Sequence, residues 1–232
     1  MIRIENLHKR FGRIKVLQGV DLHIKSGGIF AVLGPNGSGK TTLIKSILGM
    51  VIPDKGDILY RGNSISNSFL YRRDIGYLPQ IARFPENLTV REIIHMVRDV
   101  REQPAAPEPL ITLFGLNETL DKKLAHLSGG TRQKVNIVLT FMFDSEIVVL
   151  DEPTAGLDPV SMIKLKKLLN EFRQKGKRIL ITSHVMSFVE ELADEIIFLL
   201  EGKIHFKGTL SELKERTAAL DLEHSIAAIL EP

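Results

Sequence analysis

Gly34-Pro35-Asn36-Gly37-Ser38-Gly39-Lys40-Thr41 lies between an apolar run, Ile29–Leu33, and a segment with helical spacing, Lys40–Met50. A loop of the pattern G-x-x-x-x-G-K-[ST] wraps phosphate oxygens with its backbone N–H groups, and side chains at its glycine positions would block that approach. The helix that follows points the positive end of its dipole at the same oxygens. We therefore predict a phosphate-binding loop in which Lys40 neutralises β- and γ-phosphate charge and the Thr41 hydroxyl holds Mg²⁺. The alternative is a glycine-rich turn with an exposed lysine.

Composition excludes several classes of protein. The chain has 232 residues, of which 44% are hydrophobic and 25% charged, so it can bury a sizeable core as one large domain or two small ones. Its net charge of +3 is too small to indicate a nucleic-acid binder. The sequence contains no cysteine, which excludes disulfides, thiol catalysis, zinc-thiolate sites and iron–sulfur clusters. No apolar run approaches the roughly twenty residues of a membrane span. The N-terminal residues have no apolar signal core, so we expect the chain to stay where it is made.

The order of strands and helices predicts an α/β fold. The alternation of Ile2 and Ile4, and of Val20, Leu22 and Ile24, indicates antiparallel strands with one buried face. Further strands are predicted at Ile29–Leu33, Asp57–Tyr60, Ile75–Leu78, Ile147–Leu150, Arg178–Thr182, Ile196–Leu200 and Lys203–Phe206. Helices are predicted at Lys40–Met50, Gly130–Phe143 and Pro159–Lys175. Strands that alternate with helices indicate a largely parallel sheet that is covered on both sides.

Local signals place several element boundaries. Thr89-Val90-Arg91-Glu92 fits a capping box at the start of a helix, and Thr209 with Glu212 predicts a second one opening a last helix through Arg216. Gln103–Pro109 contains three prolines, and we interpret it as a surface loop inside a helical insertion. Glu201-Gly202 predicts a tight hairpin turn.

Two adjacent carboxylates, Asp151 and Glu152, follow the predicted buried strand Ile147–Leu150. In proteins with a phosphate-binding loop, an aspartate at such a strand end supports Mg²⁺. A glutamate directly after it points in another direction and can orient or deprotonate a water that attacks the γ-phosphate. We therefore interpret Asp151 and Glu152 as the hydrolytic acid pair. The alternative is a pair of surface acids, which is common in proteins.

The remaining motifs resemble those of ATP-binding cassette (ABC) proteins. Leu127-Ser128-Gly129-Gly130-Thr131-Arg132-Gln133 resembles the signature motif of that family, and it opens a helix. Gln80 resembles the Q-loop glutamine, Ala155-Gly156-Leu157-Asp158 the D-loop, and His184 the switch histidine. Phe11 lies where the family has an aromatic under the adenine. The resemblance covers roughly residues 1–215, and its motifs are in family order.

Two residues depart from the family pattern. Thr131 stands where the signature usually has glutamine, so an amide is lost, and this puts the strength of nucleotide-driven closure in question. Phe11 stands where tyrosine is usual, so stacking is retained and the hydroxyl is lost.

The resemblance implies a fold and a set of roles. The fold would be an α/β ABC-type P-loop ATPase with a mainly parallel core sheet, an antiparallel β subdomain and a helical subdomain. The nucleotide-binding domain would comprise residues 1–215, with the helical subdomain at about 81–145, and a short tail would follow at 216–232. Glu152, His184 and Gln80 would be catalytic, and Thr41, Gln80 and Asp151 would hold Mg²⁺. The residues implied to bind ATP are Phe11, Gly34, Pro35, Asn36, Gly37, Ser38, Gly39, Lys40, Thr41 and Thr42, with Ser128, Gly129 and Gly130 acting on the ATP of a second copy.

The resemblance also implies partners and a location. Two copies would pair head to tail around two ATP molecules, and a separate transmembrane permease would be driven at the inner face of the cytoplasmic membrane. The blocks LSGGTRQKV and DEPTAGLDPV are similar to those of the ATPase of the nitrous-oxide-reductase maturation transporter, which supports copper-site assembly. This similarity implies a periplasmic accessory protein that is reached through the permease, and no nucleic-acid partner. Any copper would be held by a partner, because the histidines of this chain show no paired spacing.

Three other classes stay open from the residues alone. The first is an ABC-type ATPase that acts in cofactor assembly or on another non-membrane partner. The second is a P-loop kinase or GTPase, against which the signature motif and Glu152 count. The third is a module that closes on ATP without hydrolysis, against which Glu152 and His184 count.

Overall fold

The computed structural model describes residues 1–24 and 27–230. Contacts between residues divide the chain into a first unit, 1–72 together with 178–232, and a second unit, 73–177.

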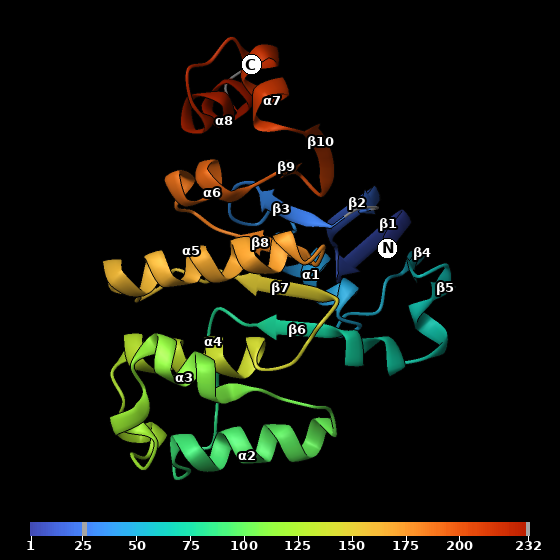
Figure 1. Ribbon diagram of the computed structural model, residues 1–232. Helices are drawn as coiled ribbons and strands as arrows, with labels where there is room; N and C mark the ends of the chain where they lie inside the picture. The colour runs from blue at the N-terminus through green and yellow to red at the C-terminus, as the bar shows by residue number, and fades with distance from the viewer. Residues whose placement is uncertain (25–26, 231–232) are drawn as a thin grey trace. The chain divides into compact units, whose positions relative to one another are not determined.

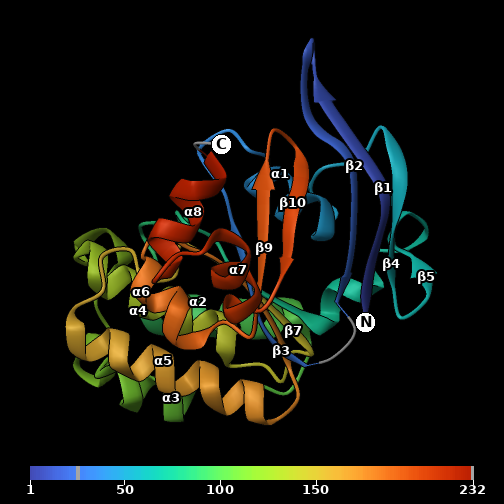
Figure 2. The ribbon, with the colours of Figure 1, turned by 90° about the horizontal axis from the view of Figure 1, so that it is seen from above.

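The first unit contains an antiparallel sheet in the order β2-β1-β4-β5. Its strands are β1 (Ile2–Phe11), β2 (Ile14–Ile24), β4 (Lys55–Tyr60) and β5 (Asn63–Ser64). The predicted alternation is confirmed, since Ile2, Ile4, Val20, Leu22 and Ile24 are all buried. Strands β1 and β2 form the long hairpin seen in Figure 2 (blue).

The hairpin contains a β-bulge at Val16. Lys9 pairs with Leu17 and Arg10 pairs with Lys15, so that Val16 is an extra residue in β2. A bulge bends its strand and re-aims the local backbone groups. The carbonyl of Val16 lies against Gly39 and Gly202, which are both in the first unit.

The same unit has a second set of strands in the order β10-β9-β3-β8. These are β3 (Gly28–Leu33), β8 (Arg178–Thr182), β9 (Glu195–Leu200) and β10 (Lys203–Gly208). Strand β3 pairs in parallel with β8 and β9, which confirms the predicted parallel arrangement. The predicted hairpin is also confirmed. Glu201 and Gly202 both have positive φ, 47° and 74°, as a two-residue turn between right-twisted strands requires.

Helix α1 (Lys40–Ile47) is shorter than predicted. We expected it to reach Met50, but Gly49 has φ +65°, in the left-handed region that ends helices. Leu43, Ile44 and Ile47 are buried, so the predicted core-facing spacing is correct.

The C-terminal part of the first unit contains one helix more than we predicted. The capping box is confirmed at the start of α7 (Leu210–Thr217), where the Thr209 side chain accepts from the Glu212 N–H and Glu212 accepts from the Thr209 N–H. The prediction that this helix is the last one is wrong, because α8 (Leu222–Leu230) follows it. Figure 1 shows α7 and α8 (red) next to β10. Leu213 and Leu222, both fully buried, pack with Phe198 into one apolar cluster, to which α6 (Met186–Leu192) also contributes.

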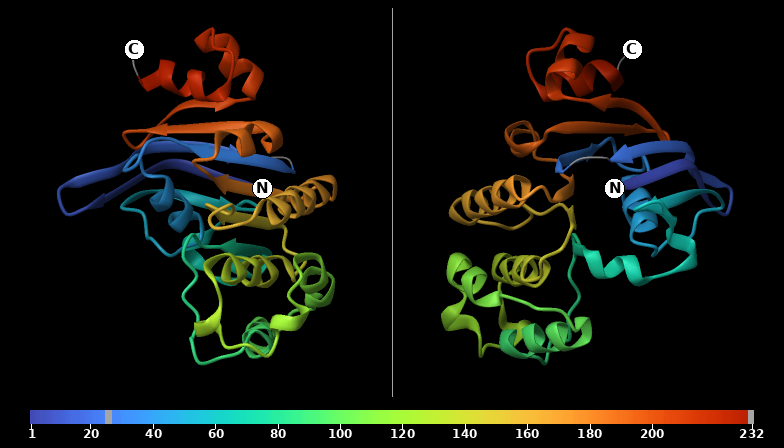
Figure 3. Two further views of the ribbon diagram at one scale, coloured as in Figure 1. Left: turned by 90° about the vertical axis from the view of Figure 1, so that its left-hand side faces the viewer. Right: turned by 45° about the vertical axis from the view of Figure 1, so that its right-hand side comes forward.

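The second unit contains the parallel pair β6 (Ile75–Leu78) and β7 (Ile147–Asp151). Its helices are α2 (Val90–Arg101), α3 (Pro107–Phe114), α4 (Gly129–Phe141) and α5 (Pro159–Gln174). The green helices α2 and α3 and the yellow-green α4 lie together in Figure 3. The capping box at Thr89 and Glu92 is confirmed.

The proline-rich segment of the second unit is only in part the loop that we predicted. Helix α3 begins at Pro107, and Pro109 also lies in its first turn. The first helical turn has no intrahelical acceptors for its N–H groups, so prolines there remove no hydrogen bond. The loop therefore ends at residue 106, and the prolines start a helix as well as ending one.

No helix within residues 1–24 and 27–230 is long and apolar enough to cross a membrane.

Candidate nucleotide site

The phosphate loop of the first unit needs glycine at two of its positions. Gly34 and Gly39 have φ of 146° and 107°, values that other residues rarely adopt. A Cβ at Gly34 would collide with the backbone carbonyl of Leu199 in β9, and a Cβ at Gly39 would lie 2.8 Å from the bulged carbonyl of Val16. The loop is therefore held between β9 and β2 so closely that only hydrogen fits at these positions.

The start of α1 offers hydrogen-bond donors to an anion. Its N-cap residue, Gly39, provides no side-chain cap, and its first turn contains no acidic residue. The first N–H groups of an α-helix have no intrahelical acceptor. In the same loop the Ser38 hydroxyl is buried and has no hydrogen-bond partner among the residues that the structure describes. These groups fit the phosphate chain that we predicted for residues 34–42.

Lys40 folds back over the loop that precedes it. Its Nζ donates to the carbonyls of Gly34, at 2.7 Å, and Pro35, at 3.0 Å. The ammonium group therefore lies over the loop, where its charge can act on a bound phosphate.

His184 reaches the same edge of the first unit as the phosphate loop. It is exposed and follows the end of β8 by two residues, while the phosphate loop follows the end of β3. Because β3 and β8 pair in parallel, their carboxyl ends meet at one edge. The structure thus brings two of the predicted site elements together.

Phe11 ends strand β1 at the tip of the hairpin, and it is 50% exposed. The Nζ of Lys9 lies 5.3 Å from the centroid of the Phe11 ring. We did not predict this contact from the sequence, although the spacing of the two residues indicates it, since residues two apart in a strand share a face.

The acid pair and Gln80 share an edge of the second unit. Asp151 is the buried last residue of β7, and Gln80 is exposed two residues beyond β6. The two strands pair in parallel with Leu78 opposite Leu150, so both side chains emerge at their carboxyl ends. Burial, together with the nearby charge of Asp151, raises the pKa of Tyr77.

Glu152 has a strained backbone. Its φ is +51°, in the left-handed region that costs a non-glycine residue on the order of 1 kcal/mol or more. Residues held in this way cluster at active sites, where the surrounding structure fixes a side chain in a direction that the regular strand would not give. The left-handed turn at Glu152 follows directly after Asp151, the last residue of β7.

The signature segment forms the start of α4. Ser128 is the N-cap, and its Oγ accepts from the Thr131 N–H at 3.2 Å. The hydroxyls of Ser128 and Thr131 are also hydrogen-bonded, at 2.9 Å. Thr131, the departure from the family pattern, thus contacts the side chain that the motif is expected to present.

The D-loop packs on the signature helix within the second unit. A Cβ at Gly130 would lie 2.6 Å from the Gly156 carbonyl, so the two backbones touch where both residues are glycine. Asp158 forms an N-cap bond to the Ser161 N–H at 2.8 Å and an ion pair with Lys134 at 2.7 Å. Hydrogen bonds from Lys134 and Ser161 hold the pKa of Asp158 well below its usual range. Lys134 could not be predicted from the sequence as a partner of Asp158, because only the fold places it against this carboxylate.

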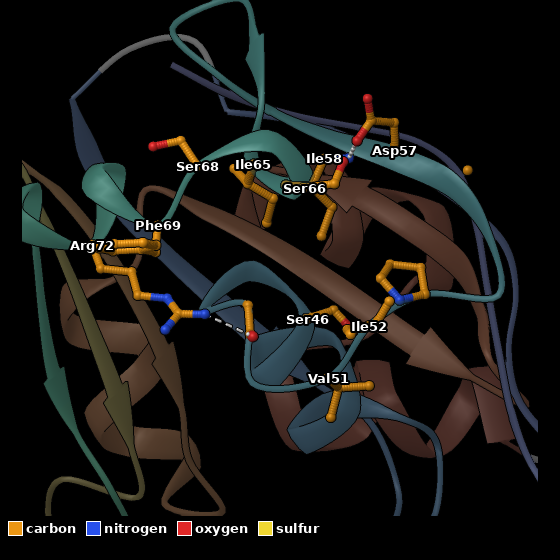
Figure 4. Close-up of a pocket in the computed structure, with 13 residues that line it drawn as sticks. Ser46, Val51, Ile52, Asp57, Ile58, Ile65, Ser66, Ser68, Phe69 and Arg72 are labelled. Atoms are coloured by element: carbon orange, nitrogen blue, oxygen red, sulfur yellow. Dashed lines mark hydrogen bonds between the residues drawn. The ribbon is translucent and has the colours of Figure 1, made fainter.

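A separate cavity of about 450 Å³ lies in the first unit, and Figure 4 shows its lining side chains. It is formed by the end of α1, the following loop with Ile52, and the segment that carries Phe69 and Arg72. The Arg72 guanidinium donates to the Gly49 carbonyl at 2.9 Å. None of the described residues that line it is a predicted site residue.

Because of the strain at Glu152, we expect a glycine variant at this position to be more stable than an alanine variant. Glycine at this position relieves the left-handed strain, so Glu152→Gly should be more stable than Glu152→Ala by on the order of 1 kcal/mol. Urea unfolding of the two variants measures the difference. The matched control is Glu171, an exposed residue of helix α5, where Ala should be more stable than Gly by about 1 kcal/mol. The same order at both positions would contradict strain at Glu152.

Comparisons with known proteins identify the family. Residues 17–155 match the ABC transporter family. The chain is 33% identical to the lantibiotic transport ATP-binding protein SrtF of Streptococcus pyogenes, over 88% of this chain and 89% of that protein. It is 34% identical to the lipopolysaccharide export system ATP-binding protein LptB of Haemophilus influenzae, over 90% of each.

Solved structures agree with this family. An ATP-binding subunit of an ABC transporter superposes with a TM-score of 0.93 at 29% identity, over 99% of both chains. An ATP-binding cassette solved as a dimer in a post-hydrolysis state with ADP and Pi superposes with a TM-score of 0.82 at 25% identity, over 90% of this chain and 99% of that one. The α/β fold with an antiparallel sheet and a parallel-rich core sheet is thus that of an ABC cassette. The chain belongs to the ABC transporter family, as an ATP-hydrolysing ATP-binding subunit.

Proposed function

We propose that this subunit converts ATP hydrolysis into the work of a separate membrane permease in an export system. The observation that carries the proposal is the phosphate loop, whose glycines, uncapped helix start and buried Ser38 hydroxyl form a cradle for a phosphate chain. The similar proteins that act in lantibiotic transport and lipopolysaccharide export support the direction of transport.

In this proposal the first unit binds the nucleotide. Residues 34–42 hold the phosphates through backbone N–H groups, Lys40 neutralises their charge, and Phe11 stacks with the adenine. His184, at the same edge as the loop, contacts the γ-phosphate. The exposed ring of Phe11 and the position of His184 after β8 support these roles.

The second unit supplies the hydrolytic groups. The Glu152 carboxylate accepts a proton from the water that attacks the γ-phosphorus, so that the water oxygen bonds to phosphorus while ADP leaves. Gln80 assists in orienting this water. Thr41, Gln80 and Asp151 would hold Mg²⁺, which would neutralise phosphate charge when bound. A hydroxyl, an amide oxygen and a carboxylate are oxygen ligands of the kind that Mg²⁺ prefers.

We further propose that two copies pair head to tail. Ser128, Gly129 and Gly130 of one copy then face the nucleotide of the other, with the helix start of α4 as the donor. The hydroxyl contact with Thr131 orients Ser128 in place of the amide that the family usually has. The similar cassette that is dimeric with ADP and Pi supports this pairing.

We also propose which transporter this subunit serves. The blocks around Ser128 and Asp151 favour the transporter of nitrous-oxide-reductase maturation, with a periplasmic accessory protein reached through the permease. The subunit would lie on the inner face of the cytoplasmic membrane, bound to the permease.

Two variants separate binding from hydrolysis. Lys40→Ala should abolish ATP binding, because it removes the charge over the phosphate loop. Glu152→Gln should keep ATP binding but lower hydrolysis by about 10²- to 10⁴-fold, since an amide cannot accept the proton. Equilibrium binding and phosphate release measure these effects. Lys45→Ala, an exposed change on the same helix as Lys40, serves as the control and should leave both unchanged. Normal ATP affinity in Lys40→Ala would disprove the loop assignment.

The copper assignment has a genetic test. In cells that lack this chain but make nitrous oxide reductase, the reductase should accumulate without its full copper content, measured by metal analysis of the purified enzyme. A fully loaded reductase in those cells would exclude this transporter and leave the general export function in place.

A further inference from the structure

Lys9 and Phe11 lie on one face of strand β1, and Phe11 ends that strand at the turn of the hairpin with β2. Figure 2 shows this hairpin (blue). Their side chains share a face because they are two residues apart in a strand. The Nζ of Lys9 lies 5.3 Å from the centroid of the Phe11 ring, within the range at which an ammonium group is attracted to the face of an aromatic ring. Half of Phe11 nevertheless remains exposed, so the ring is free to make a further contact.

The loop that follows α1 fixes the ammonium group of Lys9. Nζ donates to the Ile52 carbonyl at 2.7 Å and to Asp54 Oδ1 at 3.1 Å. The other carboxylate oxygen of Asp54 accepts from the Arg10 N–H at 2.7 Å, and the Asp54 N–H donates to the His8 carbonyl at 2.8 Å. The Lys9 side chain is only 16% exposed, which is low for a lysine. Lys9 is thus held in place as part of the structure.

The hairpin also connects the Phe11 ring to the phosphate loop inside the first unit. Phe11 pairs with Ile14 at the turn, and β2 then runs through the bulged Val16, whose carbonyl lies against Gly39 at the start of α1. Few residues of β2 therefore separate the ring from the phosphate loop, and the contact of Val16 with Gly39 fixes the strand at the loop. At the ring end, Phe11 has no hydroxyl through which a hydrogen bond could hold the ring.

We propose that Lys9 is a positioning residue that holds the ring of Phe11 for stacking with the base of the nucleotide. The ammonium group takes one face of the ring, and the rest of the ring is presented to a flat base, a contact that aromatic side chains make readily. Lys9 thereby replaces the anchoring that a tyrosine hydroxyl would give. The inference rests on the proposed function, because it requires that the base stacks on Phe11.

The test compares two ligands, ATP and inorganic tripolyphosphate, each with Mg²⁺ and each titrated calorimetrically into the full chain. Only ATP has a base, so a positioning role for Lys9 affects ATP alone. Lys9→Met keeps the aliphatic stem and removes the charge, and it should weaken ATP binding by about two- to fivefold and leave tripolyphosphate unchanged. Lys9→Arg should restore ATP binding, because a guanidinium also lies well over an aromatic face. Lys15→Met, an exposed change in the same hairpin, is the matched control and should change neither affinity.

Phe11→Ala separates this inference from the function on which it rests. It should weaken ATP binding by more than Lys9→Met does, and in its background Lys9→Met should have no further effect. If Phe11→Ala weakens ATP binding but Lys9→Met does not, the role of Lys9 is wrong and the stacking of the base on Phe11 is retained. If Phe11→Ala leaves ATP binding unchanged, the stacking of the base on Phe11 is itself wrong.

A general structural role for Lys9 would give a different result. Equal weakening of ATP and tripolyphosphate by Lys9→Met would mean that Lys9 supports the phosphate loop, and it would overturn the proposal. If Lys9→Met does not fold, Asp54→Asn offers a second route, because it weakens the anchor of the ammonium group and leaves Lys9 in place. It should reduce ATP affinity in the same ligand-selective way, and an equal loss for both ligands would again overturn the proposal.

Discussion

The close contact of backbone with backbone at the phosphate loop is the constraint on which the site depends. Gly34 faces the Leu199 carbonyl and Gly39 faces the Val16 carbonyl, with no room for a Cβ at either place. Because the loop can have no side chains there, its N–H groups are left to face a ligand. The packing behind the loop therefore requires glycine at both positions.

Close contact of backbone with backbone at glycine positions also occurs elsewhere in the molecule. The bulge at Val16 also brings its carbonyl to 2.5 Å from where a Cβ of Gly202 would lie, so the β9–β10 turn is held by the strand that holds the loop. In the second unit, Gly130 and Gly156 let the signature helix and the D-loop touch, and Lys134 pairs with Asp158 beside them. Within each unit, the segments that would meet nucleotide are fixed by tight backbone packing.

The sequence predicted those features that depend on local pattern. The strand–loop–helix order around residues 34–39, the buried strands, both capping boxes and the Glu201-Gly202 turn each need only a few neighbouring residues, and the structure has them. The contacts that it did not predict join segments that lie far apart in the chain. Lys9 is bonded to Ile52 and Asp54, Lys134 pairs with Asp158, and α8 packs through Leu222 on Phe198. The early end of α1 is different, because Gly49, which ends it, is a local signal that was open to prediction.

We propose that backbone N–H groups of the phosphate loop hold the phosphates of ATP. Nuclear magnetic resonance of the ¹⁵N-labelled protein during titration with Mg²⁺-ATP observes these N–H groups one by one. We predict that the amide signals of residues 37–41 move downfield and saturate together, because these N–H groups become hydrogen-bonded to phosphate oxygens. Saturable ATP binding that leaves these five amide signals unchanged would contradict the account.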